Sequence, residues 1–399
     1  MSSPPRRGHL PVVVTLLFVA GWATNHFAAM IPVLRDQEGL SATVLAGAFG
    51  VYALGLLPGL LGGGGVSDRV GRRPVVLIGS TIAAAGNLLM LCWHTGAGIY
   101  CGRLVVGVGV GLAMSAGTAW AADLGGRRGT TIAGTALTSG FAGGPLVSGL
   151  VAQFVTESAA LAAPFVLTIA LSLAAVALGF RATAAPPDPH RAEPPALPTT
   201  SVDRSVGRAL VRAVPMALWV FSAVTVPVVV LAGRVGGDHS GPWVPGVASA
   251  LALGTGVAAQ VAARRADWGP RAGIVGAVLA AAGFALAVVV DEQQGVGLFI
   301  VTAVLLGSAY GLCLRAGLVD VETLTPPEHR GITIGVYYVC TYLGFGVPVL
   351  LESLRGPVGT ATPLLVLTGL ALAAAALRWT QLRAGELDND ERRGLHQPG

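Results

Sequence analysis

The chain has 399 residues, of which 53% are hydrophobic and only 11% are charged, and its mean hydropathy is +0.71. Soluble globular proteins carry about 25% charged residues, so this composition excludes an ordinary soluble domain and indicates an integral membrane protein. All 25 basic residues are arginine, and the net charge of +5 is better explained by membrane topology than by nucleic-acid binding.

Twelve apolar runs follow one another along the chain, and most are long enough to cross a bilayer as a helix. The runs cover residues 10–34, 43–66, 74–93, 98–121, 130–153, 160–180, 209–233, 243–263, 271–290, 296–319, 331–351 and 358–377. With the N-terminus inside, 20 arginines fall on the cytoplasmic side and only Arg35, Arg234 and Arg355 fall outside. Because an arginine excess marks the cytoplasmic side, the sequence predicts an all-α membrane protein of twelve transmembrane helices, with both termini inside.

A polar, proline-rich stretch at 181–208 separates the sixth run from the seventh. Such a composition cannot form a core and predicts a cytoplasmic linker. It divides the chain into an N-terminal six-helix bundle at 1–180 and a C-terminal six-helix bundle at 209–383. The charged segment 384–399 is expected to be a disordered cytoplasmic tail.

Two sequence patterns recur between these halves. The glycine spacing of the fourth run returns 200 positions later in the tenth, as Gly107, Gly111 and Gly117 followed by Gly307, Gly311 and Gly317. A second pattern recurs at a shift of 202, as Arg128-Gly129-x-Thr131-Ile132 followed by Arg330-Gly331-x-Thr333-Ile334. A glycine-rich helix could mimic the first match but hardly both, so we expect two pseudo-symmetric bundles.

A charged motif lies between the second and third runs, where we expect a turn of about eight residues. Its key positions are Gly64, Asp68, Arg69, Gly71, Arg72 and Arg73. The pattern D-R-x-G-R-R resembles the loop between helices 2 and 3 of the major facilitator superfamily, in which this loop latches the two halves of a rocking transporter. The resemblance implies that Arg72 reaches Asp123 and that Asp68 lies near Gly331. The alternative is a basic loop that only fixes topology.

Two further stretches are similar to motifs of the same superfamily. Arg103-x-x-x-Gly107-x-Gly109 is similar to its helix-four motif. A stretch within the fifth run resembles the G-x-x-x-G-P-x-x-G-G signature of drug:proton antiporters. The matching positions are Gly140, Gly144, Pro145 and Gly149, and Ser148 replaces one glycine of the signature. That resemblance implies proton-coupled efflux. The same glycines and proline could instead form a packing hinge without a coupling role.

Polar groups inside the spans are the candidates for substrate binding and coupling, because burying them in hydrocarbon is costly. Asn25 and His26 lie in the first span, and histidine alone has an ordinary pKa near neutrality; the alternative for His26 is a packing role. Arg103 is expected to bond carbonyls of the first span or Asn25. We expect Arg315 to point toward the cytoplasm, within reach of Asp320 or Glu322.

Aromatic and sulfur-containing residues complete the set of candidates. Tyr338 and Tyr342 are four residues apart and so share a helix face, where their hydroxyl-bearing rings suit an amphipathic ligand; lipid-facing packing is the alternative. Cys92 and Cys101 flank a short external loop, so either a disulfide or two lipid-facing thiols fits the sequence. No cysteine spacing suggests a metal site.

These features predict a secondary transporter that moves a small organic solute by alternating access and exports it from the cell. Proton coupling, which the antiporter resemblance implies, stays open at this point, because no aspartate or glutamate lies well inside a predicted span. We expect a multi-pass monomer in the plasma membrane, surrounded by lipid, with no cofactor, no metal and no nucleic-acid partner. The alternatives are a metabolite importer of the same fold, a membrane sensor and a membrane-embedded enzyme. The spans hold no nucleophile–base pair or ligand set that an enzyme would need.

Overall fold

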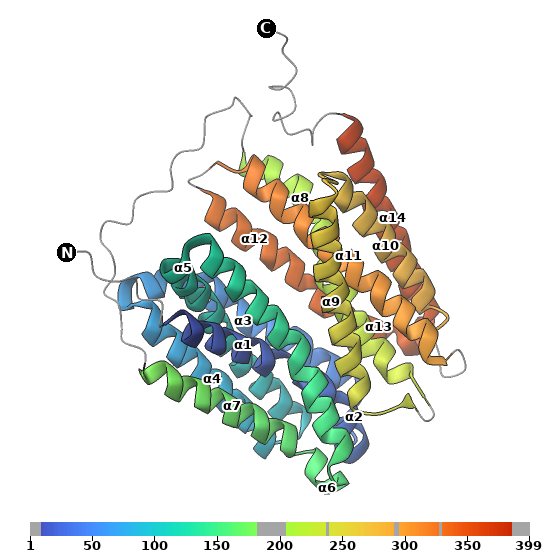
Figure 1. The fold of residues 1–399 in the computed structure, drawn as a ribbon. Helices are drawn as coiled ribbons and strands as arrows, with labels where there is room; N and C mark the ends of the chain where they lie inside the picture. The colour runs from blue at the N-terminus through green and yellow to red at the C-terminus, as the bar shows by residue number, and fades with distance from the viewer. Residues whose placement is uncertain (1–8, 182–204, 237–238, 291–294, 327–328, 385–399) are drawn as a thin grey trace, which may run out of the picture.

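The computed structural model describes residues 9–181, 205–236, 239–290, 295–326 and 329–384, which are almost entirely helical (Figure 1). The α-helices are α1 (Leu10–Asn25), α2 (Phe27–Glu38), α3 (Ala42–Val70), α4 (Arg72–Cys92), α5 (Gly96–Phe154), α6 (Glu157–Ala160), α7 (Ala163–Arg181), α8 (Val206–Thr225), α9 (Trp243–Arg265), α10 (Arg271–Ala287), α11 (Gly295–Leu324), α12 (Arg330–Tyr342), α13 (Val347–Val358) and α14 (Ala361–Arg383). A π-helix η1 (Val226–Leu231) and the 3₁₀ helices η2 (Ala232–Arg234) and η5 (Leu343–Gly346) continue α8 and α12. Most of the predicted linker and tail lies outside the described residues.

Eleven stretches of the described chain are long and apolar enough to cross a membrane. α10, with 17 residues, is apolar but shorter, and at about 1.5 Å per residue it spans about 26 Å. Each of the twelve predicted runs overlaps one of these eleven stretches or α10. α5 provides two of the spans, because Gly126 adopts φ 55° and ψ −140° and interrupts the helix. The prediction of a polytopic helical membrane protein is therefore confirmed.

The predicted eight-residue turn between the second and third spans is wrong. α3 continues to Val70 and α4 begins at Arg72, so Gly71 alone joins them. Its φ of 97° and ψ of 150° lie in a region that residues with a side chain rarely adopt, which is why a single glycine suffices to reverse the chain. The acidic and basic side chains of the motif consequently sit on helical turns.

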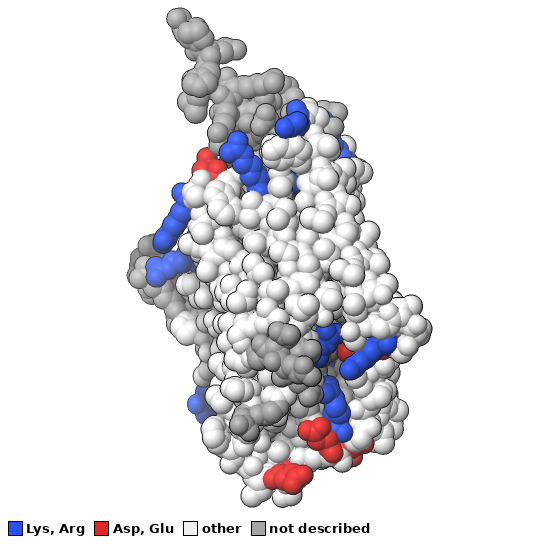
Figure 2. Space-filling model, turned by 90° about the vertical axis from the view of Figure 1, so that its right-hand side faces the viewer, with Lys and Arg blue, Asp and Glu red and all other residues white. Residues whose placement is uncertain are grey.

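The helices form two groups that lie side by side, α1–α7 and α8–α14 (Figure 1). We call the end of the bundle that carries Gly71 the motif end, and the end that carries Gly39 and Gly359 the opposite end. On the face in Figure 2, a wide band without charged side chains separates the charged ends of the molecule. This band is the surface expected to face lipid.

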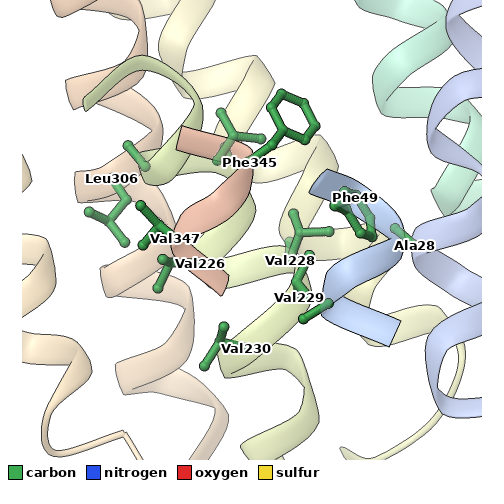
Figure 3. Packing of buried hydrophobic residues seen from close by; sticks show 14 of the residues in the cluster. Ala28, Phe49, Val226, Val228, Val229, Val230, Leu306, Phe345 and Val347 are labelled. Carbon is green, nitrogen blue, oxygen red and sulfur yellow. The ribbon is translucent and has the colours of Figure 1, made fainter. Parts of the chain in front are cut away.

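The two groups share a buried core toward the opposite end. One continuous apolar cluster includes Phe27 and Phe49 from the first group and Val228, Phe345 and Val347 from the second (Figure 3). Toward the motif end, separate clusters form within each group, and their members include, from the first, Val13, Leu17, Val76 and Trp120, and from the second, Ala213, Val321 and Tyr337. The halves are therefore joined by buried contacts at the opposite end and packed independently at the motif end.

The recurring glycines make equivalent contacts in the two groups. A methyl group at Gly107 or Gly111 of α5 would collide with the backbone of α3. A methyl group at Gly307 or Gly311 of α11 would collide in the same way with the backbone of α9. Each pair of glycines thus lets two helices approach backbone to backbone, in agreement with the predicted repeat.

We expect replacement of Gly71 by alanine to destabilise the protein. An alanine at φ 97° is strained, and the expected cost exceeds about 1 kcal/mol. Gly65→Ala is the matched control, because Gly65 lies inside α3 with open space around its α-carbon and alanine favours a helix by about 1 kcal/mol. Thermal unfolding in detergent should show a lower melting temperature for Gly71→Ala alone; equal melting of both variants would contradict this account.

Candidate functional site

Arg103 of α5 lies fully buried inside the first group, with 0% of its surface exposed. Its Nη1 donates a hydrogen bond of 2.7 Å to the Thr24 carbonyl and its Nε donates one of 3.3 Å to the Ala48 carbonyl. Thr24 lies in the last turn of α1, where carbonyls lack partners within the helix. The prediction that Arg103 bonds carbonyls of the first span is confirmed, whereas Asn25 bonds elsewhere.

Three aromatic rings surround the same guanidinium group. Its carbon lies 4.8 Å from the ring centroid of Phe27, 5.3 Å from that of Phe49 and 4.4 Å from that of Tyr52. Each distance is within the range of a cation–π interaction, which strengthens when the cation is desolvated. We call Arg103 and these three rings the arginine cage.

The arginine cage continues into the second group through Phe345 of η5. Phe345 stacks on Phe49 at 6.3 Å and approaches Tyr52 at 6.1 Å between ring centroids. On its other side it contacts Phe221 at 4.9 Å and Tyr342 at 5.5 Å. A buried chain of rings thus crosses from one half to the other.

The two candidate tyrosines of α12 differ in environment. Tyr342 is 8% exposed and stacks on Phe221 at 4.8 Å, so it belongs to the ring chain. Tyr338 is half-buried and packs against the shared core. Their neighbour Tyr337 is fully buried and donates a hydrogen bond of 3.3 Å to the Cys313 carbonyl.

A polar contact joins the halves near mid-bundle. The Asn25 side chain donates to the Phe141 carbonyl at 3.0 Å and to the Ser249 hydroxyl at 3.3 Å, and that hydroxyl also donates to Phe141 at 3.2 Å. Asn25 and Phe141 belong to the first group and Ser249 to α9 of the second. Asn25 is therefore a contact between the halves, a role that its position in the sequence did not reveal.

His26 lies inside the first group, away from that contact. It is fully buried, its Nε2 lies 2.7 Å from the Asn87 carboxamide oxygen, and its ring meets the edge of Phe165 at 5.2 Å. His26 also separates α1 from α2. This geometry favours the packing interpretation over the coupling one.

The glycine-rich stretch of the fifth span packs against helices on two sides. Methyl groups at Gly140 and Gly144 would collide with α1, and one at Gly149 would collide with the backbone that enters α9. Pro145 lies at the same crossing, since a methyl group at Gly246 of α9 would come within 2.6 Å of its carbonyl. These residues thus lie where α5 crosses α9 of the other half at close distance, and such close packing is what the packing-hinge interpretation expects.

The charged motif forms a local network at the motif end. Arg72 contacts Asp68 at 2.6 Å, Asp123 at 3.2 Å and the Ser67 hydroxyl at 2.6 Å. The Gly64 carbonyl accepts a 2.8 Å hydrogen bond from Ser67. The predicted approach of Arg72 to Asp123 is confirmed as a contact, and its gating role stays a prediction.

The other two arginines of the motif differ from Arg72. Arg73 donates to the carbonyls of Gly179 at 3.1 Å and Phe180 at 2.6 Å, which fastens α4 to the end of α7. Arg69 is exposed on the last turn of α3. The Asp68 side chain is 62% exposed, so its proposed partner at the start of α12 stays a prediction.

A buried ion pair in the second group was not predicted from the sequence. Arg378 of α14 holds the Asp320 carboxylate with both terminal nitrogens, at 2.5 and 2.9 Å, and the two residues are 1% and 6% exposed. The predicted last span ends at 377, before Arg378, and Asp320 is one of two predicted partners of Arg315. Asp320 pairs with Arg378 instead, because α14 extends to Arg383 and Arg378 therefore lies inside the helix.

The four cysteines are free thiols, so the Cys92–Cys101 disulfide is absent. Among the described residues, no group of three or more histidine, cysteine, aspartate or glutamate side chains could hold a metal ion.

Most of the chain matches a single protein family. A sequence model described as Major Facilitator Superfamily matches residues 13–347. The chain belongs to this superfamily. It is therefore a multi-span membrane transporter, and the resemblance inferred from the Gly64–Arg73 motif is confirmed.

Curated relatives of this superfamily member match over short stretches. The Multidrug resistance protein MdtL of Klebsiella pneumoniae (strain 342) is 31% identical over 98 residues, which is 25% of this chain and 24% of MdtL. The Myo-inositol transporter 1 of Cryptococcus neoformans is 36% identical over 100 residues, which is 25% of this chain and 17% of that protein. The matches thus span about a quarter or less of these relatives.

Solved structures of the superfamily share the whole fold. A peptide transporter POT superposes with a TM-score of 0.79 at 15% identity, covering 96% of this chain and 98% of that chain. The inward open xylose transporter XylE from E. coli superposes with a TM-score of 0.72 at 15% identity, covering 93% and 95%. At this identity the likeness concerns the fold alone.

We expect Arg103→Lys to lower the melting temperature of the transporter by several degrees. Lysine keeps the buried charge but cannot stack on three rings while donating to two carbonyls, and one charge-assisted hydrogen bond is worth about 1.5–3 kcal/mol. Arg315→Lys is the matched control, because Arg315 is half-buried and outside the cage. Thermal unfolding of both variants in detergent tests this; wild-type melting of Arg103→Lys would refute the cage's structural role.

Proposed function

We propose that this transporter exports a small amphipathic organic compound across the plasma membrane by alternating access, coupled to the proton gradient. The observation that carries the proposal is the uneven joining of the halves. They share one core at the opposite end and have separate cores at the motif end. A transporter that rocks about a central site needs this asymmetry in each of its end states.

The arginine distribution supports an orientation with both termini and the motif end in the cytoplasm. In that orientation, the described state is closed toward the outside and loosened toward the cytoplasm. We propose that the six-helix halves, 1–180 and 209–383, move as units joined by the linker 181–208. Release of the Arg72 network would accompany the reverse movement.

The proposed solute site lies between the halves at mid-depth. Asn25 and Ser249 provide polar groups there. Tyr52 donates a hydrogen bond to the Thr24 hydroxyl, next to Asn25 in the chain, and contacts Phe345, which in turn contacts Tyr342. Ring faces with nearby amide and hydroxyl groups suit a ligand with an apolar body and a few polar atoms. The partial similarity to a multidrug resistance protein supports export of such a compound.

A polyol importer of the same fold is the second candidate. It is favoured by the 36% identity with the myo-inositol transporter over 100 residues. Ring-lined contacts and a single amide provide fewer hydrogen-bonding groups than a polyol with many hydroxyls would use, so we rank this function second.

Transport in proteoliposomes with an imposed pH gradient tests the proposal. Purified protein should move ethidium, faster when the gradient is present, and should leave radiolabelled myo-inositol unmoved. Arg72→Ala should insert normally but lose most ethidium transport, because it disconnects Asp68 from Asp123.

Empty liposomes and Arg383→Ala protein are the controls, since Arg383 is an exposed arginine at the end of α14 and outside the motif. Transport of myo-inositol without ethidium would replace the export proposal by the polyol one. Movement of neither compound, with a folded protein, would contradict both.

A further inference from the structure

A cavity of about 200 Å³ lies at the opposite end, between the two groups of helices. One wall belongs to α2 of the first group, and the other to η1, η2 and the entry to α9 of the second. Its lining includes Ile31, Arg35, Asp36, Val228, Val229 and Val235. This cavity is far from the mid-depth contact of Asn25 with Ser249, since Arg35 lies ten residues, or about 15 Å of helix, beyond Asn25.

Arg35 is the half-buried cation of this cavity. Its guanidinium reaches across to the second group, where a methyl group at Gly233 would lie only 3.1 and 3.2 Å from the two terminal nitrogens. Its Nε is buried and has no hydrogen-bond partner in the described structure. A buried guanidinium nitrogen without a partner is costly, and a carboxylate is the group whose geometry it matches.

The remaining wall of the cavity is mostly apolar. Ile31, Val228 and Val229 are buried side chains of the shared core, and Val235 is a half-buried lining residue. Asp36 also lines the cavity but is exposed, and successive helical residues point about 100° apart. Solvent therefore screens the Asp36 charge more than that of Arg35.

We propose that this cavity binds a small organic anion with an apolar body, such as an aromatic carboxylate. The carboxylate pairs with Arg35, and the apolar body packs on the isoleucine and valines of both groups. Because both halves form the walls, the bound anion stabilises the arrangement in which the opposite end is joined. This site is separate from the proposed transport site and does not require that the transported solute be an anion.

Calorimetric titration of purified protein in detergent with benzoate tests the site, with benzamide as the neutral isostere. Wild type should bind benzoate and should bind benzamide at least about tenfold more weakly, because benzamide lacks the charge that Arg35 pairs with. Arg35→Gln should weaken benzoate binding by at least about tenfold and leave benzamide binding unchanged. Asp36→Asn should bind benzoate at least as tightly as wild type.

Two further variants separate this site from general effects. Arg355→Gln is the matched control, because Arg355 is an exposed arginine at the same end that pairs with Glu352 and does not line the cavity; it should bind benzoate like wild type. Val235→Trp enlarges a lining side chain so that it fills the cavity, and it should abolish benzoate binding while Arg35 remains.

Equal binding of benzoate and benzamide, or unchanged benzoate binding by Arg35→Gln, would overturn the proposal. So would the absence of benzoate binding to folded wild type. The titration involves no transport, so its outcome is independent of whether ethidium is exported.

Discussion

A single buried guanidinium group constrains the arrangement of the first half. Placing an arginine at this depth costs several kcal/mol unless protein groups replace its hydration. Arg103 obtains this replacement from two helix carbonyls and three ring faces, and the interruption of the first span at His26 leaves the Thr24 carbonyl available. Two of the rings, Phe49 and Tyr52, also form the surface on which Phe345 of the second half rests. The buried charge therefore orients the surface on which the two halves meet.

The rest of the interface between the halves also consists of close contacts between specific residues, from mid-depth to the opposite end. Small residues let α5 and α9 cross nearly backbone to backbone at Gly149 and Gly246, and Asn25 adds a polar link at mid-depth. No comparable shared core is found among the described residues toward the motif end, where Arg72 and Arg73 hold helices of the first half to one another. Contacts within each half are thus extensive at both ends of the bundle, whereas buried contacts between the halves are concentrated at the opposite end. Two rigid units that rock against each other require this distribution of contacts.

Much of this architecture could be predicted, because hydropathy and arginine placement report directly on spans in a membrane protein. The contacts of Arg103 with α1 and of Arg72 with Asp123 were predictable, since both rested on motif resemblance. The one-residue turn at Gly71 could not be predicted. The charged residues around it are typical of a loop, although they fit equally well on the ends of two helices. The pairing of Asp320 with Arg378 was also missed, because the apolar run ends at 377 and Arg378 therefore looked like a residue beyond the span, although α14 continues to Arg383. Contacts across the halves, such as Asn25 with Ser249, depend on tertiary packing that no local pattern encodes.

In the proposed alternating access, the opposite end opens when the motif end closes. Spin-label distances in lipid nanodiscs test it most directly, in protein whose four cysteines are replaced by alanine. One label pair replaces Arg69 and Ile332 at the motif end, and the other replaces Ser158 and Val358 at the opposite end; all four are exposed. We predict two distance populations for each pair, with ethidium lengthening one pair's mean distance while it shortens the other's. A single unchanging distance for both pairs, or a change of both in the same direction, would contradict the account.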